Sequence, residues 1–435
     1  MSEGRMPPSG GAWAGGSEGL EKTALALGIV PLTDCAPLVV AHEKGFFARH
    51  GLNVRLSREA SWATIRDKVA LGALDGAQML AAMPLAATLD VGGAQPDMLT
   101  AFSMDLNGNA ITVSTALYAR MCEADAAAMT QPATTGQALR KVIEADRAAG
   151  RPPMSFAMVF PVSTHNYQLR YWMAAAGIDP QRDVRLVVIP PPHMVANLEA
   201  GVIDGYCVGE PWNQRAVERG VGQVLVTSYE LWNNGPEKVL GVSRRWAETH
   251  PNTHRALVRA LIEAAQWLDA VDNRAEVVAL LSARHYLNAP PQVVGQSMTG
   301  TWRYGRDSAP VSMPDFNVFY RYAATFPWRS HAVWLLTQMV RWGQLDPGVA
   351  YREVAEAVYR CEVYRAAAAE LGVSVPATDY KTEGAHGGPW SLPTPGGSID
   401  MGADRFFDGM HFDPAQPAAY LADLATAAPG ARSAR

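Results

Sequence analysis

Several polar side chains stand where the sequence passes from an apolar run to the start of a helix. Thr164 and His165 follow Ser163 in PVSTHNYQLRYW, and Glu210 precedes Pro211 in GVIDGYCVGEPWNQ. Hydroxyl and imidazole groups can donate hydrogen bonds, and the free N–H groups of a first helical turn attract negative charge. This pattern predicts a site for a small anion. A carboxylate such as Glu210 would repel the anion, so it is not expected as a direct ligand.

Three further residues are candidates for the same site, although each has an ordinary structural explanation. Trp62 opens a helix in ASWATIRD, but tryptophans are mostly buried by packing. Lys238, in NNGPEKVLGV, could equally be a solvated lysine, and Asn109, in LNGNAITV, a turn residue. His165 could also be a capping or core histidine. We expect Glu210 to cap its helix or to pair with a base such as Lys238.

The sequence contains no recognisable catalytic set. It has no HExxH or P-loop motif and no GxSxG elbow that follows a strand. The cysteines Cys35, Cys122, Cys207 and Cys361 lie far apart, which indicates neither a zinc site nor a disulfide framework. Covalent catalysis by Cys35 or Cys207 would require a base, and none is visible. We expect a binding protein that is not an enzyme and carries no metal or cofactor.

Composition narrows the class of partner. The chain has 435 residues, of which 48% are hydrophobic, so it can bury two or three cores. A net charge of −5 gives no overall attraction to nucleic acid or to an anionic membrane. No apolar run approaches the roughly 18 to 20 residues of a membrane-spanning helix. We therefore expect no direct nucleic-acid binding and no membrane insertion.

Apolar runs alternate with amphipathic stretches from Thr23 to Gly241, which predicts an α/β fold with parallel sheets of βαβ units. Strands are expected at Leu25–Val30, Asn53–Leu56, Gly76–Leu80, Ile111–Ser114, Ser155–Phe160, Val184–Ile189, Gly205–Val208 and Val221–Val226. Helices are expected at Ser61–Leu71, Pro84–Leu89, Thr135–Ala149, His165–Ala176, His193–Glu199 and Pro211–Arg219.

A short internal repeat indicates two lobes of one design. The segments ALGALDGAQMLAAMP (Ala70–Pro84) and EAGVIDGYCVGEP (Glu199–Pro211) share a glycine, two apolar residues, Asp-Gly, an apolar run and a proline. Both follow a helix that itself follows a strand, so the supersecondary context also matches. If the lobes face each other, their strand-to-helix junctions converge on one cleft.

We expect a disordered segment at 1–22, a first lobe at 23–115 together with about 240–375, and a second lobe at 116–239. Residues 376–435 are expected to form an extended tail that packs on the surface. Long helices are predicted beyond Gly241, at Thr253–Val271, Ala275–Arg284, Ser330–Trp342 and Tyr351–Leu371. The stretch Pro376–Gly402, rich in Pro, Gly and Ser, is predicted as a loop or linker.

Several long runs resemble the nitrate- and bicarbonate-binding proteins of ABC uptake systems, the NrtA/CmpA type. These runs are AHEKGFFARHGLNVRL, SWATIRDKVALGALDGAQMLAAMPLA, LNGNAITV, STHNYQLRYWMAAAGI, PPPHMVANLEAGVIDGYCVGEPWNQRAV and PEKVLGV. The similarity covers about residues 23–380 and the tail run FFDGMHFDPAQPAAYL. It implies a two-lobed periplasmic-binding-protein fold of type II, with C-terminal helices, that closes over one small oxyanion.

The resemblance also implies roles for individual residues. Trp62 is similar to the pocket tryptophan, His165 to the imidazole donor and Gly209 to a backbone contact in the second lobe. Lys238 resembles the lysine of nitrate binders, where bicarbonate binders carry an acidic residue, so nitrate is favoured. Asn109 matches a position that is glutamine in nitrate transporters, so its hydrogen bond would be shorter. The residues expected around this set are Thr164, Glu210 and Gln78.

Within this family the sequence most resembles the cytoplasmic nitrate/nitrite sensors of the NasS type. Residues 1–22 show neither a signal-peptide pattern nor a lipid-anchor cysteine. The resemblance implies a cytoplasmic sensor for nitrate assimilation that releases an RNA-binding antiterminator (NasT-like, with an ANTAR domain) when ligand binds. Two alternatives stay open: the substrate-binding component of a nitrate or bicarbonate ABC transporter, and an enzyme of related fold that makes the thiamine pyrimidine.

Overall fold

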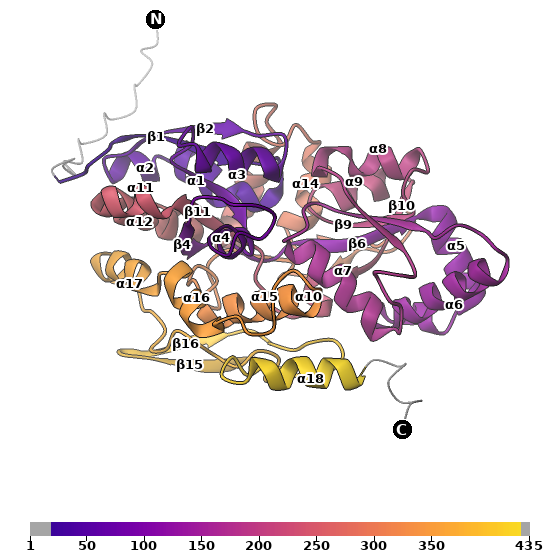
Figure 1. Ribbon diagram of the computed structural model, residues 1–435. Helices are drawn as coiled ribbons and strands as arrows, with labels where there is room; N and C mark the ends of the chain where they lie inside the picture. Colours follow the sequence, from indigo (N-terminus) through magenta and orange to yellow (C-terminus); the bar gives the residue numbers. More distant parts are fainter. Residues whose placement is uncertain (1–18, 428–435) are drawn as a thin grey trace, which may run out of the picture.

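The computed structural model describes residues 19–427, which form two lobes and a C-terminal tail (Figure 1). Each lobe is built on a five-stranded sheet, in the order β2-β1-β3-β11-β4 in the first and β8-β7-β9-β6-β10 in the second. The first sheet consists of β1 (Ala24–Ile29), β2 (Asn53–Arg58), β3 (Gly76–Leu80), β4 (Met98–Ser103) and β11 (Lys238–Ser243). The second consists of β6 (Asn109–Ser114), β7 (Ser155–Met158), β8 (Arg185–Val188), β9 (Gly205–Gly209) and β10 (Gly222–Thr227).

The expectation of purely parallel sheets is wrong, because each sheet contains one reversed strand. Strand β11 runs antiparallel to β3 and β4, and β6 runs antiparallel to β9 and β10. These two strands are not parts of βαβ units, since each follows a crossing of the chain from one lobe to the other. Strand β6 is the first strand of the second lobe, whose strands β6 to β10 are consecutive in sequence, whereas β11 returns to the first sheet after the whole second lobe.

The first crossing of the chain also lies earlier in the sequence than the predicted boundary between the lobes. The expected division after residue 115 placed Ile111–Ser114 in the first lobe, whereas β6 lies inside the second sheet. The change of lobe falls near β5 (Leu106–Asn107), which pairs with β14 (Asn317–Val318) outside both large sheets. The predicted segment 1–22 lies mostly outside the described residues.

Helices cover the sheets, and serine caps start several of them. In the first lobe these are α1 (Ala36–Glu43), α2 (Phe46–Arg49), α3 (Trp62–Ala70), α4 (Met83–Thr88), α11 (Arg244–Thr249), α12 (Pro251–Asp269) and α13 (Arg274–Ser282). In the second they are α5 (Thr115–Ala124), α6 (Thr135–Ala148), α7 (Thr164–Ala175), α8 (Met194–Glu199), α9 (Trp212–Glu218) and α10 (Ser228–Leu231). Ser61 and Ser163 each accept a hydrogen bond from a backbone N–H of the first turn of α3 and α7.

The C-terminal helices are α14 (Pro291–Met298), α15 (Arg329–Arg341), α16 (Tyr351–Val358), α17 (Cys361–Glu370) and α18 (Pro417–Ala427). The helix predicted over Tyr351–Leu371 is thus two helices. The break occurs because Arg360 donates its backbone N–H to the Thr100 carbonyl of β4 at 2.8 Å, so a tertiary hydrogen bond replaces a helical one. The short strands β12 (Thr301–Trp302) and β13 (Val311–Ser312) pair with each other.

The repeat seen in the sequence has a structural counterpart in the two lobes. Asp75 accepts the backbone N–H of Ala26 at 2.9 Å, and Asp204 accepts that of Ser155 at 2.8 Å. In return the backbone N–H of each aspartate bonds to the carbonyl of the same residue, at 2.8 Å in both lobes. Each Asp-Gly pair therefore fixes the start of an equivalent parallel strand.

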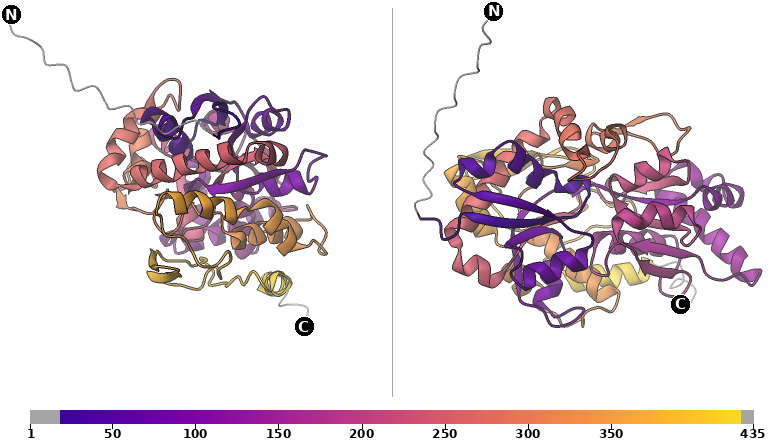
Figure 2. Two further views of the ribbon diagram at one scale, coloured as in Figure 1. Left: turned by 90° about the vertical axis from the view of Figure 1, so that its left-hand side faces the viewer. Right: turned by 90° about the horizontal axis from the view of Figure 1, so that it is seen from above.

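The tail runs along one side of both lobes (Figures 1 and 2). Part of the stretch predicted as a loop forms a hairpin of β15 (Trp390–Thr394) and β16 (Gly397–Met401). Further on, Asp408 accepts hydrogen bonds from the Tyr171 hydroxyl of α7 at 2.7 and 2.9 Å. Buried charges attach the tail to α15, and we call this group the tail cluster: Ser330, His331, Lys381, Glu383 and Asp404.

Among residues 19–427, no helix is both long and apolar enough to cross a membrane.

Candidate anion-binding site

The predicted site residues that begin β6, β11 and α7 meet in one buried group between the lobes. Lys238 is the first residue of β11, Asn109 is the first of β6, and His165 lies in the first turn of α7. All three are 0% exposed. Lys238 is therefore not a solvated lysine and Asn109 is not a turn residue. We call this group the cleft cluster: Asp34, Gln78, Asp105, Asn109, Thr164, His165, Glu237 and Lys238.

Lys238 is the positive centre of the cluster. Its Nζ lies 2.7 Å from Asp34 Oδ2 and also contacts Glu237 Oε1. Its backbone N–H donates to Asp105 Oδ1 at 2.9 Å. Burial disfavours the ammonium charge, but the carboxylates of Asp34, Glu237 and Asp105 outweigh burial and raise the pKa of Lys238. The side chain therefore stays charged.

Asp34 is held in place from the first lobe. Gln78 donates its Nε2 to Asp34 Oδ1, and its own Oε1 accepts the backbone N–H of Val30 at 2.7 Å. Burial raises the pKa of Asp34 to about 6, although Lys238 opposes this shift. Burial and the charge of Asp34 also raise the pKa of Asp105 well above its ordinary value. The cluster thus contains more carboxyl groups than cations.

The second lobe contributes donors, and they meet at Glu237. Thr164 donates its Oγ1 to Glu237 Oε2, and Asn109 donates its Nδ2 to the same oxygen at 2.7 Å. His165 Nε2 lies 3.5 Å from Glu237 Oε1. Burial, together with the charge of Lys238, lowers the pKa of His165 well below its ordinary value, so the imidazole is neutral. Neither ring nitrogen has a hydrogen-bond partner among the described residues.

Trp62 and Gly209 border the cluster. The Trp62 ring is buried, and its centroid lies 5.5 Å from Lys238 Nζ. Its Nε1 is a buried donor without a partner in the described part of the chain. A Cβ on Gly209 would lie 3.3 Å from Asp34 Oδ2 and 3.4 Å from Asn109 Oδ1. Glycine therefore leaves the backbone of β9 open toward the cluster.

Glu210 lies beside this cluster and caps its helix. Its Oε2 accepts the backbone N–H of Gln214 at 3.2 Å, which is the first of the two roles expected for it. Within residues 19–427 its Oε1 has no hydrogen-bond partner, and the side chain makes no ion pair with Lys238. Burial raises the pKa of Glu210 to about 8, so the carboxyl is largely protonated at neutral pH.

Sequence reasoning missed three acceptors of this cluster, Asp34, Asp105 and Glu237. Asp34 follows the carboxyl end of β1, where ligands of α/β proteins sit, and this position was a usable signal. Glu237 is adjacent to Lys238 in the quoted motif. Asp105 has no local sequence signal, since only the pairing of β4 with β11 brings it to Lys238.

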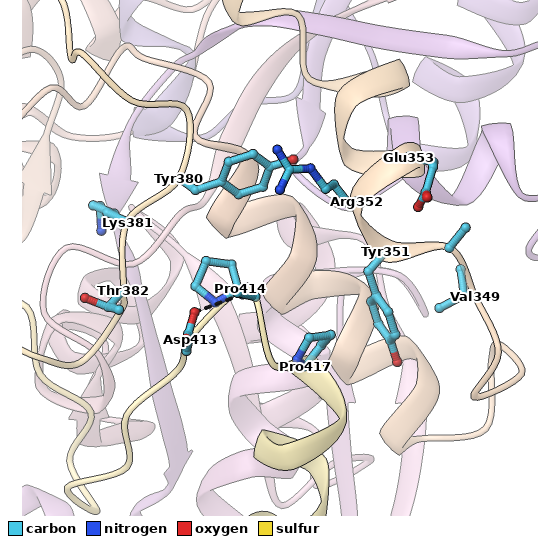
Figure 3. A pocket seen from close by; sticks show the side chains of 12 residues that line it. Val349, Tyr351, Arg352, Glu353, Tyr380, Lys381, Thr382, Asp413, Pro414 and Pro417 are labelled. Carbon is cyan, nitrogen blue, oxygen red and sulfur yellow. Dashed lines mark hydrogen bonds between the residues drawn. The ribbon is translucent and has the colours of Figure 1, made fainter.

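A wide groove lies elsewhere, between the start of α16 and the tail (Figure 3). It has a volume of 610 Å³ and contains none of the residues predicted for the anion. Its lining includes Tyr351, Arg352, Tyr380 and Asp413. The groove is much larger than one small ion, and its residues lie far in sequence from the cleft cluster. We therefore do not assign the anion to it.

Comparison with known proteins agrees with this geometry. Residues 18–282 match the NMT1-like family. The nitrate/nitrite binding protein NrtA of Nostoc sp. strain PCC 7120 is 31% identical over 96% of this chain and 89% of its own length. The chain belongs to this family, in its NrtA/CmpA-type nitrate- and bicarbonate-binding branch. The crystal structure of the periplasmic nitrate-binding protein NrtA from Synechocystis PCC 6803 matches 93% of this chain with a TM-score of 0.82 and 31% identity.

Longer relatives also match. The nitrate import ATP-binding protein NrtC of Synechocystis sp. is 41% identical over 94% of this chain, which spans only 56% of that protein. The NrtA/CmpA-type fold therefore also occurs within proteins nearly twice as long. The two-lobed α/β fold implied by the resemblance is confirmed by the structural match.

Proposed function

We propose that the protein binds nitrate or nitrite at the cleft cluster. Both ions are planar, carry one negative charge and accept hydrogen bonds without donating any, so their site requires donors. The observation that carries the proposal is the convergence of donors from both lobes beside one buried, charged lysine. These donors are Lys238 Nζ, Thr164 Oγ1, Asn109 Nδ2 and His165 Nε2.

Binding would proceed by opening and closing of the lobes. The polar side chains of the cleft cluster are at most 3% exposed, so an ion can enter only when the lobes separate. A ligand that contacts both lobes favours the closed form, because it gains all of its hydrogen bonds only there. The reaction is binding alone, and we propose no enzymatic step.

The relatives support a role as the substrate-binding component of a nitrate or bicarbonate ABC transporter. Those of similar length are named nitrate/nitrite binding protein NrtA and bicarbonate-binding protein CmpA. Lys238 favours nitrate over bicarbonate, since bicarbonate has a hydroxyl that can donate to an acidic residue at this position, whereas nitrate has none.

A second candidate is a cytoplasmic sensor that releases an RNA-binding antiterminator when nitrate or nitrite binds. One observation favours it: Tyr171 lies on the same helix as His165 and donates its hydroxyl to Asp408 of the tail, so closure around a ligand would be expected to alter this contact. A partner that recognises this surface would then distinguish the two forms of the protein.

Calorimetric titration tests the ligand. The purified protein is titrated with nitrate, nitrite and bicarbonate, and the titrations are repeated on Lys238→Glu. We expect heat with nitrate or nitrite that the substitution abolishes. The matched control is Lys141→Glu, because Lys141 forms a surface ion pair with Asp125 in the second lobe. Equal binding by the wild type and Lys238→Glu would exclude Lys238 from the site.

Two further measurements separate the roles. A sensor should co-purify with its antiterminator in nitrate-free buffer and should release it when nitrate is added. A transport component should instead be recovered with the membrane transporter or from the periplasm of the native cells. Co-elution with the antiterminator that does not change when nitrate is added would contradict the sensor function.

A further inference from the structure

The side chain of Glu237 occupies an unusual position, because three of the four donors proposed for nitrate bind it. Its Oε1 contacts Lys238 Nζ and lies 3.5 Å from His165 Nε2. Its Oε2 accepts from Thr164 Oγ1 and from Asn109 Nδ2. The side chain is 0% exposed. Oε1 is therefore engaged from the first lobe and Oε2 from the second.

A carboxylate is a close chemical match for the proposed ligand. Like nitrite and nitrate it is planar, shares one negative charge between its oxygen atoms and only accepts hydrogen bonds. A site that satisfies both oxygens of Glu237 would also satisfy two oxygens of either ion. The three donors that bind Glu237, Lys238 Nζ, Thr164 Oγ1 and Asn109 Nδ2, cannot satisfy a carboxylate and a nitrate together, because each donates only a small number of protons in fixed directions.

Asp34 and Glu237 both contact Lys238, yet they differ in how they are held. Asp34 is bound through Gln78, which is itself fixed to the backbone of Val30 in the first lobe. Glu237 is held by Lys238 next to it and by side chains of the second lobe. Separation of the lobes leaves the contacts of Asp34 to Gln78 and Lys238 intact, whereas it removes the second-lobe donors from Glu237.

We propose that Glu237 is an internal competitor that fills the anion position when no ligand is bound and links the two lobes. This inference rests on the proposed binding of nitrate or nitrite. A ligand must displace the carboxylate, so the apparent affinity is lower than that of the vacated site by the fraction of time the site is free. The same contacts favour closure of the lobes without ligand. Glu237 thereby sets both the threshold concentration and the resting shape of the protein.

The test is the substitution Glu237→Gln, which keeps the size of the side chain and removes its charge. Titration with sodium nitrate is expected to show at least tenfold tighter binding than the wild type. Small-angle X-ray scattering without nitrate is expected to show a larger radius of gyration, which returns to the wild-type value when nitrate is added. Glu237→Asp keeps the charge but withdraws it by one methylene, and should give an intermediate gain in affinity.

The matched control is Glu383→Gln in the tail cluster, where a buried glutamate also contacts a lysine and lies 3.5 Å from a histidine. Its nitrate affinity should stay within about twofold of the wild type. Thermal melts verify that each variant is folded. Nitrate binding by Glu237→Gln that is no tighter than in the wild type, with unchanged scattering, would overturn the inference.

If none of the proteins binds nitrate or nitrite, the proposed function fails, and scattering of the unliganded proteins still decides the inference. Expansion of Glu237→Gln alone would support the link between the lobes. Identical scattering of all unliganded variants would refute it.

Discussion

The cleft cluster and the tail cluster contain similar residues, but they differ in the number of carboxyl groups and, within the described residues, of polar atoms without a partner. Each contains a buried lysine beside two carboxylates, and in each a histidine Nε2 lies 3.5 Å from a glutamate oxygen. In the tail cluster the glutamate is well supported: Ser330 donates to Glu383 Oε1 at 2.7 Å, and Lys381 contacts Oε2. Burial disfavours this charge, but Lys381 outweighs it and the pKa of Glu383 is lowered to about 2.

The cleft cluster has an additional carboxyl group and several polar atoms without a partner. Asp105 Oδ2, Asn109 Oδ1 and both ring nitrogens of His165 are buried without hydrogen bonds in the described part of the chain. Buried polar groups in a purely structural network are normally satisfied, so such atoms require an explanation. The tail cluster has fewer such atoms, His331 Nε2 and Asp404 Oδ2 among the described residues. The comparison teaches that the two clusters differ in degree: the one with the additional carboxyl group and more unpartnered atoms lies between the lobes, and the one with a fully supported glutamate attaches the tail.

The largest expected effect is a difference in nitrate affinity between variants of the two buried lysines, Lys238 and Lys381. Lys238→Met removes the cation proposed to bind nitrate, and we expect at least a hundredfold loss of affinity. Lys381→Met removes a cation of the tail cluster and should leave the affinity within about threefold. Calorimetry at a temperature where both variants are folded measures the difference. Equal losses in the two variants would remove the functional distinction between the clusters.

The second effect concerns stability. Lys381→Met leaves Glu383 buried without its cation, and breaking a buried pair in this way typically costs about 3–5 kcal/mol. The free energy of unfolding from urea titration should fall by about this amount. The double variant Lys381→Met with Glu383→Leu should recover most of the loss, because it leaves no unpaired charge on that glutamate. A single variant as stable as the wild type would show that the tail cluster does not support the fold.

The third effect is a pH dependence of opposite sign for two buried glutamates. The pKa of Glu210 is raised from 4.5 to about 8, so its contribution to stability is complete below pH 4.5 and is lost as the pH rises through about 8. The pKa of Glu383 is lowered from 4.5 to about 2, so its contribution is present above pH 4.5 and is lost as the pH falls through about 2.

Glu210→Gln should therefore gain stability relative to the wild type as the pH rises from 6 to 9, by a few kcal/mol at roughly 1.4 kcal/mol per pKa unit. Glu383→Gln should lose stability at pH 5 to 8 and approach the wild type near pH 2. Melting temperatures across this range measure both differences. Parallel pH profiles of the two variants would contradict the assigned shifts.

The smallest expected effect tests the contact between the lobes and the tail. Asp408→Ala removes the acceptor of the Tyr171 hydroxyl, and a hydrogen bond to a charged group contributes about 1.5–3 kcal/mol. If this contact favours the closed form, nitrate affinity should fall by about threefold to tenfold in titration. Asp413→Ala is the control, because the side chain of Asp413 accepts only from the nearby backbone N–H of Ala415 among the described residues. Equal affinities of the two variants would show that the tail does not follow closure.

Apolar periodicity and capping residues predicted much of the fold. They failed where the structure depends on contacts between residues far apart in the sequence. Strands such as Gly76–Leu80 and helices such as Thr135–Ala148 follow from apolar periodicity. The reversed strand at Asn109–Ser114 was placed in the wrong sheet, because strand pairing across a lobe crossing leaves no periodic trace. The break between α16 and α17 depends on one hydrogen bond to Thr100, which the sequence does not reveal.

The residues of the candidate site divide in the same way, into those with a local sequence signal and those without one. Lys238, His165 and Asn109 could be proposed because motifs and junctions marked them. Asp105 could not, since it meets Lys238 only through folding. The carboxylate of Glu237 was not predicted, because an acidic side chain is not expected in an anion site and only the folded structure places it among the donors.

The return of the chain to the first sheet as β11 has a consequence for how the molecule folds and unfolds. Strand β11 lies inside the first sheet, between β3 and β4, and β6 lies inside the second, between β9 and β10. The second sheet is continuous in sequence, from β6 to β10, whereas a fragment that ends at the first crossing would lack β11 and leave β3 and β4 each with an unpaired row of backbone groups. The first lobe is therefore not an autonomous folding unit, because its sheet is completed only after the chain has returned from the second lobe.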